Sequence, residues 1–216
     1  MAWMRNGGAA LAAMLVTGPL VGTRAHADDS RRQERHIGEA AAERELYVSE
    51  LVLFNTKQIA LGELALQRSK DPQVRRFARQ LVRDHRKHLT AVREWAEGQS
   101  LEIAAVDLST RPEEGVGGSG IEEGYEARIV GVDKHLDQAI GAAQQDVNAL
   151  REEKGKDFDK AFVSRVVEDQ EKGRELLDEG LDTYRGDSAF SLLLNRTDNL
   201  ASRHAERGRA LEEKLD

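Results

Sequence analysis

Four polar side chains occupy positions in helical stretches where apolar side chains are expected. They are Gln58, His85, Gln170 and His204, and each lies near the middle of its stretch, on the apolar line that recurs every three or four residues. Imidazoles can ligate transition metals, and imidazoles and amides can also form buried hydrogen-bonded networks. If these stretches pack as a bundle, we expect the four side chains to meet in one buried polar layer.

Two interpretations of this layer remain open. In the first, His85 and His204 ligate a transition metal with help from Asp84 or Asp169. A di-iron carboxylate site is not expected, because the chain has no Glu-x-x-His motif. In the second, which we favour, the layer is structural and no cofactor is expected. Asp84 and Asp169 are then surface residues paired with Arg or Lys one turn away, and His88 faces solvent.

Five helical stretches must position these residues. The pattern predicts helices over residues 46–69, 72–98, 125–154 and 157–184, and a fifth from residue 188. The connection Lys70-Asp71-Pro72 is so short that the first two helices must be antiparallel neighbours. Asp71 is the expected cap of the second helix, with Pro72 at its first position.

An internal repeat suggests that two halves of the chain are related. At a constant offset of 85 residues, Phe77 matches Phe162 and His85 matches Gln170. Two related helical hairpins that face each other are typical of four-helix bundles. We therefore predict an all-α, ferritin-like four-helix bundle in residues 46–216. The helix at 125–154 is the additional one, and a glycine-rich linker at 113–124 precedes it.

The N-terminus has the pattern of an export signal. Arg5 precedes an apolar run from Ala9 to Val21, and Ala25-His26-Ala27 forms a cleavage site. We expect residues 1–27 to be a signal peptide cut after Ala27, and residues 28–45 to be a flexible lead-in. The mature chain is then periplasmic or secreted, with no transmembrane segment.

Composition narrows the function further. The chain has no cysteine, which excludes thiolate chemistry, zinc–cysteine sites and disulfides. Its net charge is -7, with both signs interspersed, so nucleic acid is not an expected partner. No nucleophile triad or phosphate-binding loop is present, and a non-enzymatic role is favoured. We expect a structural or interaction-mediating protein of the cell envelope, with an unidentified protein or envelope partner. The alternative is a metal-binding or oxidoreductase-like bundle.

Two segments resemble a known family. ALGELALQRSKDPQVRRFARQLVRDHRKHL and FDKAFVSRVVEDQEK, with the helix around His204, resemble the exported bacterial family called domain of unknown function 4142. Its members are often labelled predicted outer membrane proteins. The resemblance implies a ferritin-like bundle, a signal peptide and no established activity.

The chain departs from that family's pattern at two positions. Members commonly have an Asp-His pair in both segments; here the first is Asp84-His85, but the second is Asp169-Gln170. The family's early glutamate is replaced by Gln58. Amides are poor ligands for transition metals and good hydrogen-bond partners, so these replacements weaken the metal interpretation.

Overall fold

The computed structural model describes the backbone of residues 22–101, 103, 106, 108 and 126–215, with side chains from residue 42 onward in the first helix and from residue 134 onward in the third. It divides into two compact units, residues 1–40 and residues 41–216. The described residues form five helices and no strand: α1 (Gly22–Arg68), α2 (Pro72–Gly98), α3 (Glu126–Glu152), α4 (Gly155–Thr183) and α5 (Ser188–Leu215). The prediction of an all-α helical bundle is confirmed.

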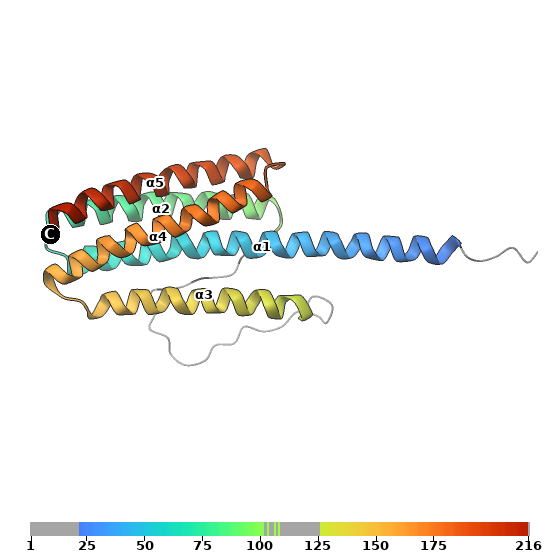
Figure 1. Cartoon of the computed structure of the whole chain (residues 1–216), viewed down its shortest axis with the longest axis horizontal. Coiled ribbons are helices and arrows are strands. Elements are labelled where there is room, and N and C mark those ends of the chain that lie inside the picture. The colour runs from blue at the N-terminus through green and yellow to red at the C-terminus, as the bar shows by residue number, and fades with distance from the viewer. Residues whose placement is uncertain (1–21, 102, 104–105, 107, 109–125, 216) are drawn as a thin grey trace, which may run out of the picture. The chain divides into compact units, whose positions relative to one another are not determined.

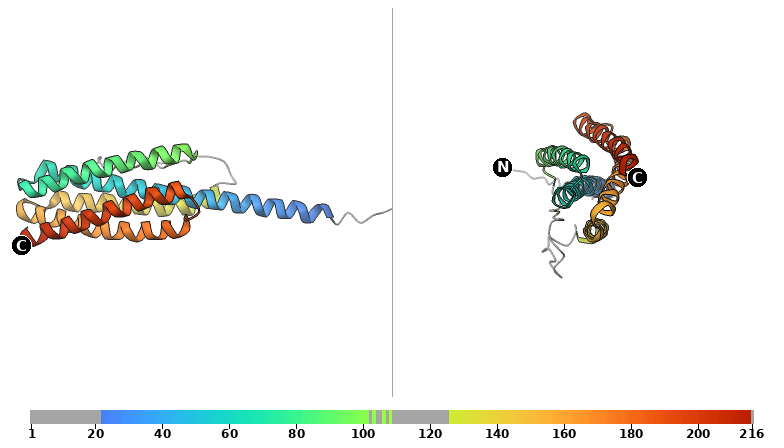
Figure 2. Two further views of the ribbon diagram at one scale, coloured as in Figure 1. Left: turned by 90° about the horizontal axis from the view of Figure 1, so that it is seen from above. Right: turned by 90° about the vertical axis from the view of Figure 1, so that its left-hand side faces the viewer.

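Within residues 41–216, helices α1, α2, α4 and α5 surround one core, and α3 lies alongside (Figures 1 and 2). Buried apolar side chains form two clusters. One cluster includes Leu51 and Phe190, and the other includes Leu81 and Phe162. The four polar residues of the sequence pattern fall between these clusters along their helices.

The turn between α1 and α2 is built as its sequence predicts. The Asp71 carboxylate accepts hydrogen bonds from the backbone N–H groups of Gln73 (2.7 Å) and Val74 (3.0 Å), and Pro72 occupies the first helical position. The cap satisfies two N–H groups that have no partner inside the helix. It fixes the start of α2, and therefore the position of His85 along the axis of the bundle.

The N-terminal boundary of α1 differs from the prediction. Residues 28–45 were expected to be a flexible lead-in, but α1 already begins at Gly22. The segment is rich in Ala, Glu and Arg, which favour helix even without an apolar stripe, and a helix propagates readily from a formed end. The expected cleavage after Ala27 falls within α1 and remains a prediction. The expected linker at 113–124 lies outside the described residues.

Helix α3 packs against the other helices. Its apolar side chains at Leu136, Ala143, Val147 and Leu150 are buried. From the same helix, Asp146 accepts a hydrogen bond from Lys57 of α1 at 2.6 Å. Although its stripe is thin, α3 therefore contributes to the core.

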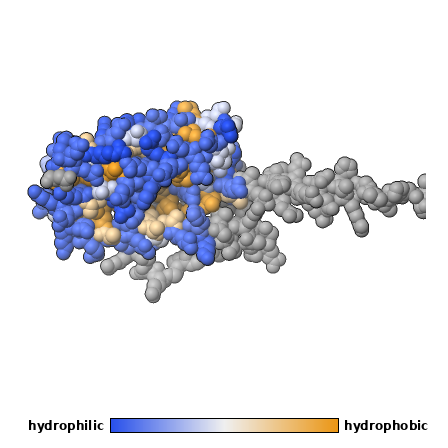
Figure 3. Space-filling model, in the orientation of Figure 1, coloured by the Kyte–Doolittle hydropathy of each residue, from blue (hydrophilic) through white to orange (hydrophobic). Residues whose placement is uncertain are grey.

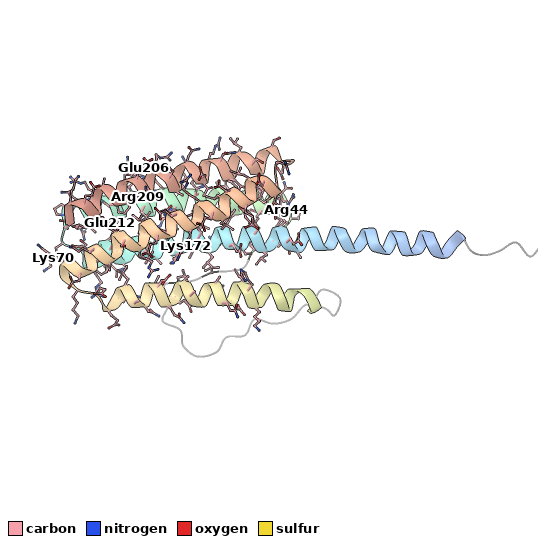
Figure 4. The ribbon with its side chains drawn as sticks, in the orientation of Figure 1. Arg44, Lys70, Lys172, Glu206, Arg209 and Glu212 are labelled. Atoms are coloured by element: carbon pink, nitrogen blue, oxygen red, sulfur yellow. The ribbon has the colours of Figure 1, made fainter. Side chains whose placement is uncertain are left out.

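The surface is mostly hydrophilic in the view of Figure 3. Charged side chains such as Lys172 on α4 and Glu206 and Arg209 on α5 point outward (Figure 4). No helix in the described part of the chain has a stretch long and apolar enough to cross a membrane.

Candidate functional site

The structure brings the four predicted polar residues together in the middle of the bundle. Gln58, His85 and Gln170 have no exposed surface, and His204 is 1% exposed. Gln170 Nε2 lies 2.9 Å from Gln58 Oε1 and 3.1 Å from His85 Nε2, and the His85 and His204 rings stack with centroids 5.4 Å apart. We call these residues, with Asn55 and Asp169, the polar layer.

One end of the polar layer is a carboxylate that can only accept hydrogen bonds. Gln58 Nε2 donates to Asp169 Oδ2 at 3.0 Å, so the amide of Gln58 turns its oxygen toward Gln170. Gln170 must therefore present its NH₂ group, whose second hydrogen points at His85 Nε2. Because Asp169 can only accept, it determines which group donates in each hydrogen bond from Gln58 through Gln170 to His85.

The other end of the layer is a backbone carbonyl, which is also acceptor-only. Asn55 Nδ2 donates to the carbonyl of Leu51 at 2.7 Å, which leaves Asn55 Oδ1 to accept from His85 Nδ1 at 3.0 Å. Both ends therefore require the same His85 tautomer, with the proton on Nδ1 and the lone pair on Nε2. His85 is neutral, and both of its nitrogens are engaged.

The electrostatics of His85 agree with this assignment. Burial lowers its pKa well below the usual value of 6.5, and His204 and His88 lower it further. Phe54 contacts the ring edge-on at 5.4 Å between centroids. Phe54 rests in turn on Gly173 of α4, where an added Cβ would lie 2.5 Å from the Phe54 ring. A side chain at position 173 would displace the Phe54 ring from its present place.

Asp169 belongs to the buried layer, and its predicted place on the surface was wrong. It is 5% exposed, and its Oδ1 accepts from Lys57 Nζ at 2.7 Å. Burial raises its pKa above the usual value of 3.8, and the bonds from Lys57 and Gln58 oppose that rise. The partner is not a neighbour on its own helix; the long Lys57 side chain of α1 reaches it and also binds Asp146 of α3.

His204 has a different environment from His85. Neither of its ring nitrogens has a hydrogen-bond partner in the described structure, and its nearest charged group is Asp84 Oδ2, 3.5 Å from Nε2. Burial lowers its pKa from 6.5 to about 4; Asp84 opposes this shift, and nearby arginines such as Arg203 add to it. Asp84 also lies 3.3 Å from Arg83 Nε, so it pairs with an adjacent arginine and not with one a turn away.

The polar layer does not fit the metal site considered from the sequence. The Nε2 lone pair of His85, which a metal would need, already accepts a hydrogen bond from Gln170. The stacked rings of His85 and His204 present their faces to one another, while ligating lone pairs lie at ring edges. Among the described residues, no group of three His, Cys, Asp or Glu side chains is placed to hold a metal ion.

Residues matched by the sequence repeat meet inside the bundle. Phe77 and Phe162 contact each other with centroids 6.1 Å apart, and His85 bonds to Gln170. Matched positions that touch are expected when two similar helices face each other about an approximate two-fold axis. The repeat therefore identified real partners across α2 and α4.

Sequence reasoning missed two members of this region and misplaced another. Asn55 lies one turn before Gln58 on the same face of α1, a spacing that could have identified it. Lys57 lies beside that face, and only its long side chain brings it in. His88, expected in solvent, is partly buried, and its Nδ1 lies 3.1 Å from Thr197 Oγ1 of α5.

Comparison with known proteins gives one family. The family model described as "Domain of unknown function (DUF4142)" matches residues 31–211. No curated protein and no solved structure matches the chain. The matched range includes all of the polar layer and α3. Because it spans well over half of the sequence, the chain belongs to the DUF4142 family.

Proposed function

We propose that this protein is a non-enzymatic, exported helical bundle with a structural or interaction-mediating role in the cell envelope. Export rests on the signal-peptide pattern that ends at Ala27. The ferritin-like bundle is here a scaffold, and its buried polar layer fixes how the helices fit together. An apolar layer would tolerate helix rotation or sliding, whereas a directed hydrogen-bond chain does not.

One observation carries the proposal: the hydrogen-bond chain that runs from Asp169 to the Leu51 carbonyl leaves His85 with no free nitrogen. A histidine whose two nitrogens are engaged is not available as a ligand, nucleophile or general base. Its role is to connect Gln170 of α4 to Asn55 of α1. This is a structural function in which α2 acts as the bridge.

Metal analysis separates this role from the metalloprotein alternative. The protein is purified from a periplasmic fraction without a histidine tag or chelator, and its metal content is measured together with its melting temperature in added zinc, copper, iron and manganese. We expect far less than one metal per chain and no rise in melting temperature. A near-stoichiometric metal that is lost in both His85→Ala and His204→Ala would overturn the proposal.

Complementation tests the role in the cell. In a strain lacking the gene, we expect His85→Gln to restore envelope integrity as wild type does, because glutamine can both accept from Gln170 and donate to Asn55. The matched variant His85→Leu keeps similar bulk without either bond, and it should rescue less because less folded protein accumulates. If His85→Gln folds at wild-type levels and fails to rescue, the imidazole itself is required and the scaffold role is wrong.

A further inference from the structure

An open groove lies between α2 and α5, on the outer side of the polar layer. Its volume is about 720 Å³, and matched positions of the two helices line it. These are the i, i+3, i+4 and i+7 positions of one face of each helix: Asp84, Lys87, His88 and Ala91 on α2, and Arg196, Asn199, Leu200 and Arg203 on α5. Leu193 also lines the groove. The lining is mixed, with apolar surface from Ala91, Leu193 and Leu200 beside the charged and polar side chains.

Three cations line the groove without a partner among the described residues. Lys87, Arg196 and Arg203 form no ion pair or hydrogen bond with any other residue that the structure describes. The one carboxylate in the groove, Asp84, is already shared between Arg83 and His204. Elsewhere on α4 and α5, exposed arginines such as Arg174 and Arg209 are paired with carboxylates. Lys87, Arg196 and Arg203 thus line one groove together in a protein whose net charge is -7.

The three groove cations all act on the imidazole of His88. Lys87, Arg196 and Arg203 all act on its ring and lower its pKa, after burial, which is the largest cause; Asp84 opposes them. Thr197 donates its hydroxyl hydrogen to the Leu193 carbonyl, so it accepts from His88 Nδ1–H. The His88 proton is therefore on Nδ1, and Nε2 has no hydrogen-bond partner among the residues that the structure describes.

We propose that the α2–α5 groove binds a phosphate-bearing small molecule, with Arg196, Arg203 and Lys87 around the phosphate. Arginine forks bind phosphate oxygens in pairs, and lysine adds a mobile point charge. The groove is larger than a bare phosphate needs, and Leu193, Leu200 and Ala91 offer apolar contact to an organic group. A phosphate ester fits both the cationic and the apolar part of the groove. This inference goes beyond the proposed scaffold role, since no residue of the hydrogen-bonded chain through His85 lines the groove.

The same chemistry could reach the groove as a free ester or as a lipid headgroup, and binding measurements separate the two. Glycerol 3-phosphate and inorganic phosphate are titrated into the full chain by calorimetry. Vesicles of phosphatidylcholine with and without phosphatidylglycerol are tested by co-sedimentation. Saturable 1:1 binding of glycerol 3-phosphate, undiminished by vesicles, supports a free ester; binding to the phosphatidylglycerol vesicles that displaces glycerol 3-phosphate supports a headgroup.

Charge-matched variants decide whether the groove is responsible. Arg196→Gln/Arg203→Gln removes two groove cations, and Arg76→Gln/Arg79→Gln removes two exposed cations of α2 outside the groove. We expect the groove variant to weaken binding at least about tenfold, because it removes two arginines that would donate charge-assisted hydrogen bonds to the phosphate. The control variant should bind within about twofold of wild type. Equal weakening in both variants, or no saturable binding by wild type, overturns the proposal.

The imidazole of His88 provides a readout that does not depend on affinity. When a phosphate ester occupies the groove, its charge should raise the pKa of His88, measured by NMR titration of the ring. The shift should be absent in Arg196→Gln/Arg203→Gln, and circular dichroism should show that this variant remains folded, because both side chains are exposed. A ligand-induced shift of equal size in the groove variant would place the ligand elsewhere.

Discussion

The two buried histidines of the polar layer face each other, yet their hydrogen bonding differs. Each nitrogen of His85 has a hydrogen-bond partner, while neither nitrogen of His204 has one. Their rings stack 5.4 Å apart, and both are almost completely buried. Burial lowers the pKa of both, so the contrast lies in their bonds and not in their charge.

The difference follows from which helices surround each ring. His85 of α2 lies against polar residues of α1 and α4, and the two acceptor ends of the chain fix its tautomer. His204 of α5 lies against the edge of the Phe77 ring and the partly exposed Asp84. One half of the layer is therefore a connected hydrogen-bond network, in which Gln170 Oε1 has no partner among the described residues, and the other half borders the groove through Asp84. We therefore expect the hydrogen-bond network around His85 to contribute most to the stability of the fold. We expect the half around His204 and Asp84 to contribute less to stability and to respond more to changes in nearby charge.

The largest expected effect comes from removing the cation that neutralises the network. Lys57→Met leaves the Asp169 carboxylate buried with only Gln58 as partner, and we expect unfolding free energy to fall by about 3–5 kcal/mol. Urea unfolding measures the loss. Arg209→Met, which breaks an exposed pair with Glu171, is the control and should cost about 0–1 kcal/mol.

A double variant tests the cause of that loss. Lys57→Met/Asp169→Leu removes both charges, and much of the lost stability should return because no buried charge remains unpaired. If the double variant is no more stable than Lys57→Met, the loss comes from packing of the lysine side chain, and the network does not depend on charge balance.

The second prediction compares the two histidines directly. His85→Leu leaves one N–H of Gln170 and the Asn55 oxygen unpaired, and should cost about 3 kcal/mol at about 1–3 kcal/mol per buried group. His204→Leu breaks no hydrogen bond and should change stability by less than about 1 kcal/mol. Thermal and urea unfolding of the two variants at neutral pH give the comparison, and equal losses would contradict the asymmetry.

The main elements of this arrangement could be predicted from sequence, because side-chain periodicity determines which face of a helix is buried. Gln58, His85, Gln170 and His204 each interrupt an apolar stripe, and all four are buried. The partners could not be predicted, since they depend on helix rotation and height. Asp169 lies beside the stripe, and it is buried because Lys57 of α1 and Asp146 of α3 close over it. Similarly, the cations of the groove gather only when α2 and α5 lie side by side.

Lowering the pH should destabilise the folded protein through its buried histidines. Because the folded-state pKa values lie below 6.5, the unfolded chain binds protons that the folded protein does not. The free energy of unfolding is therefore highest above pH about 6.5. It falls as the pH drops toward the folded-state pKa, which is about 4 for His204. Each histidine contributes a slope of up to about 1.4 kcal/mol per pH unit. Asp169, whose pKa is raised by burial, acts in the opposite sense.

Urea unfolding at several pH values between about 7 and 5 measures that slope. His204→Leu should keep neutral-pH stability and lose part of the acid dependence, since one of the three imidazoles with a lowered pKa among the described residues is gone. If wild type and His204→Leu show the same slope, His204 takes up a proton without unfolding, and its environment is more polar than its burial suggests.

The smallest expected effect concerns the carboxylate between His204 and the groove. Asp84 is the one group that raises the His204 pKa against burial and the surrounding arginines. Asp84→Asn should therefore lower the pKa of His204 below about 4, while stability at neutral pH changes by no more than about 0.5 kcal/mol because the group is partly exposed. NMR titration of the imidazoles measures the shift. Asp198 lies on the same helix as His204 and pairs with Arg174 of α4, and Asp198→Asn should leave the pKa of His204 unchanged. An unshifted His204 in Asp84→Asn would show that the 3.5 Å approach is not a charge interaction, and that both halves of the layer are governed by burial alone.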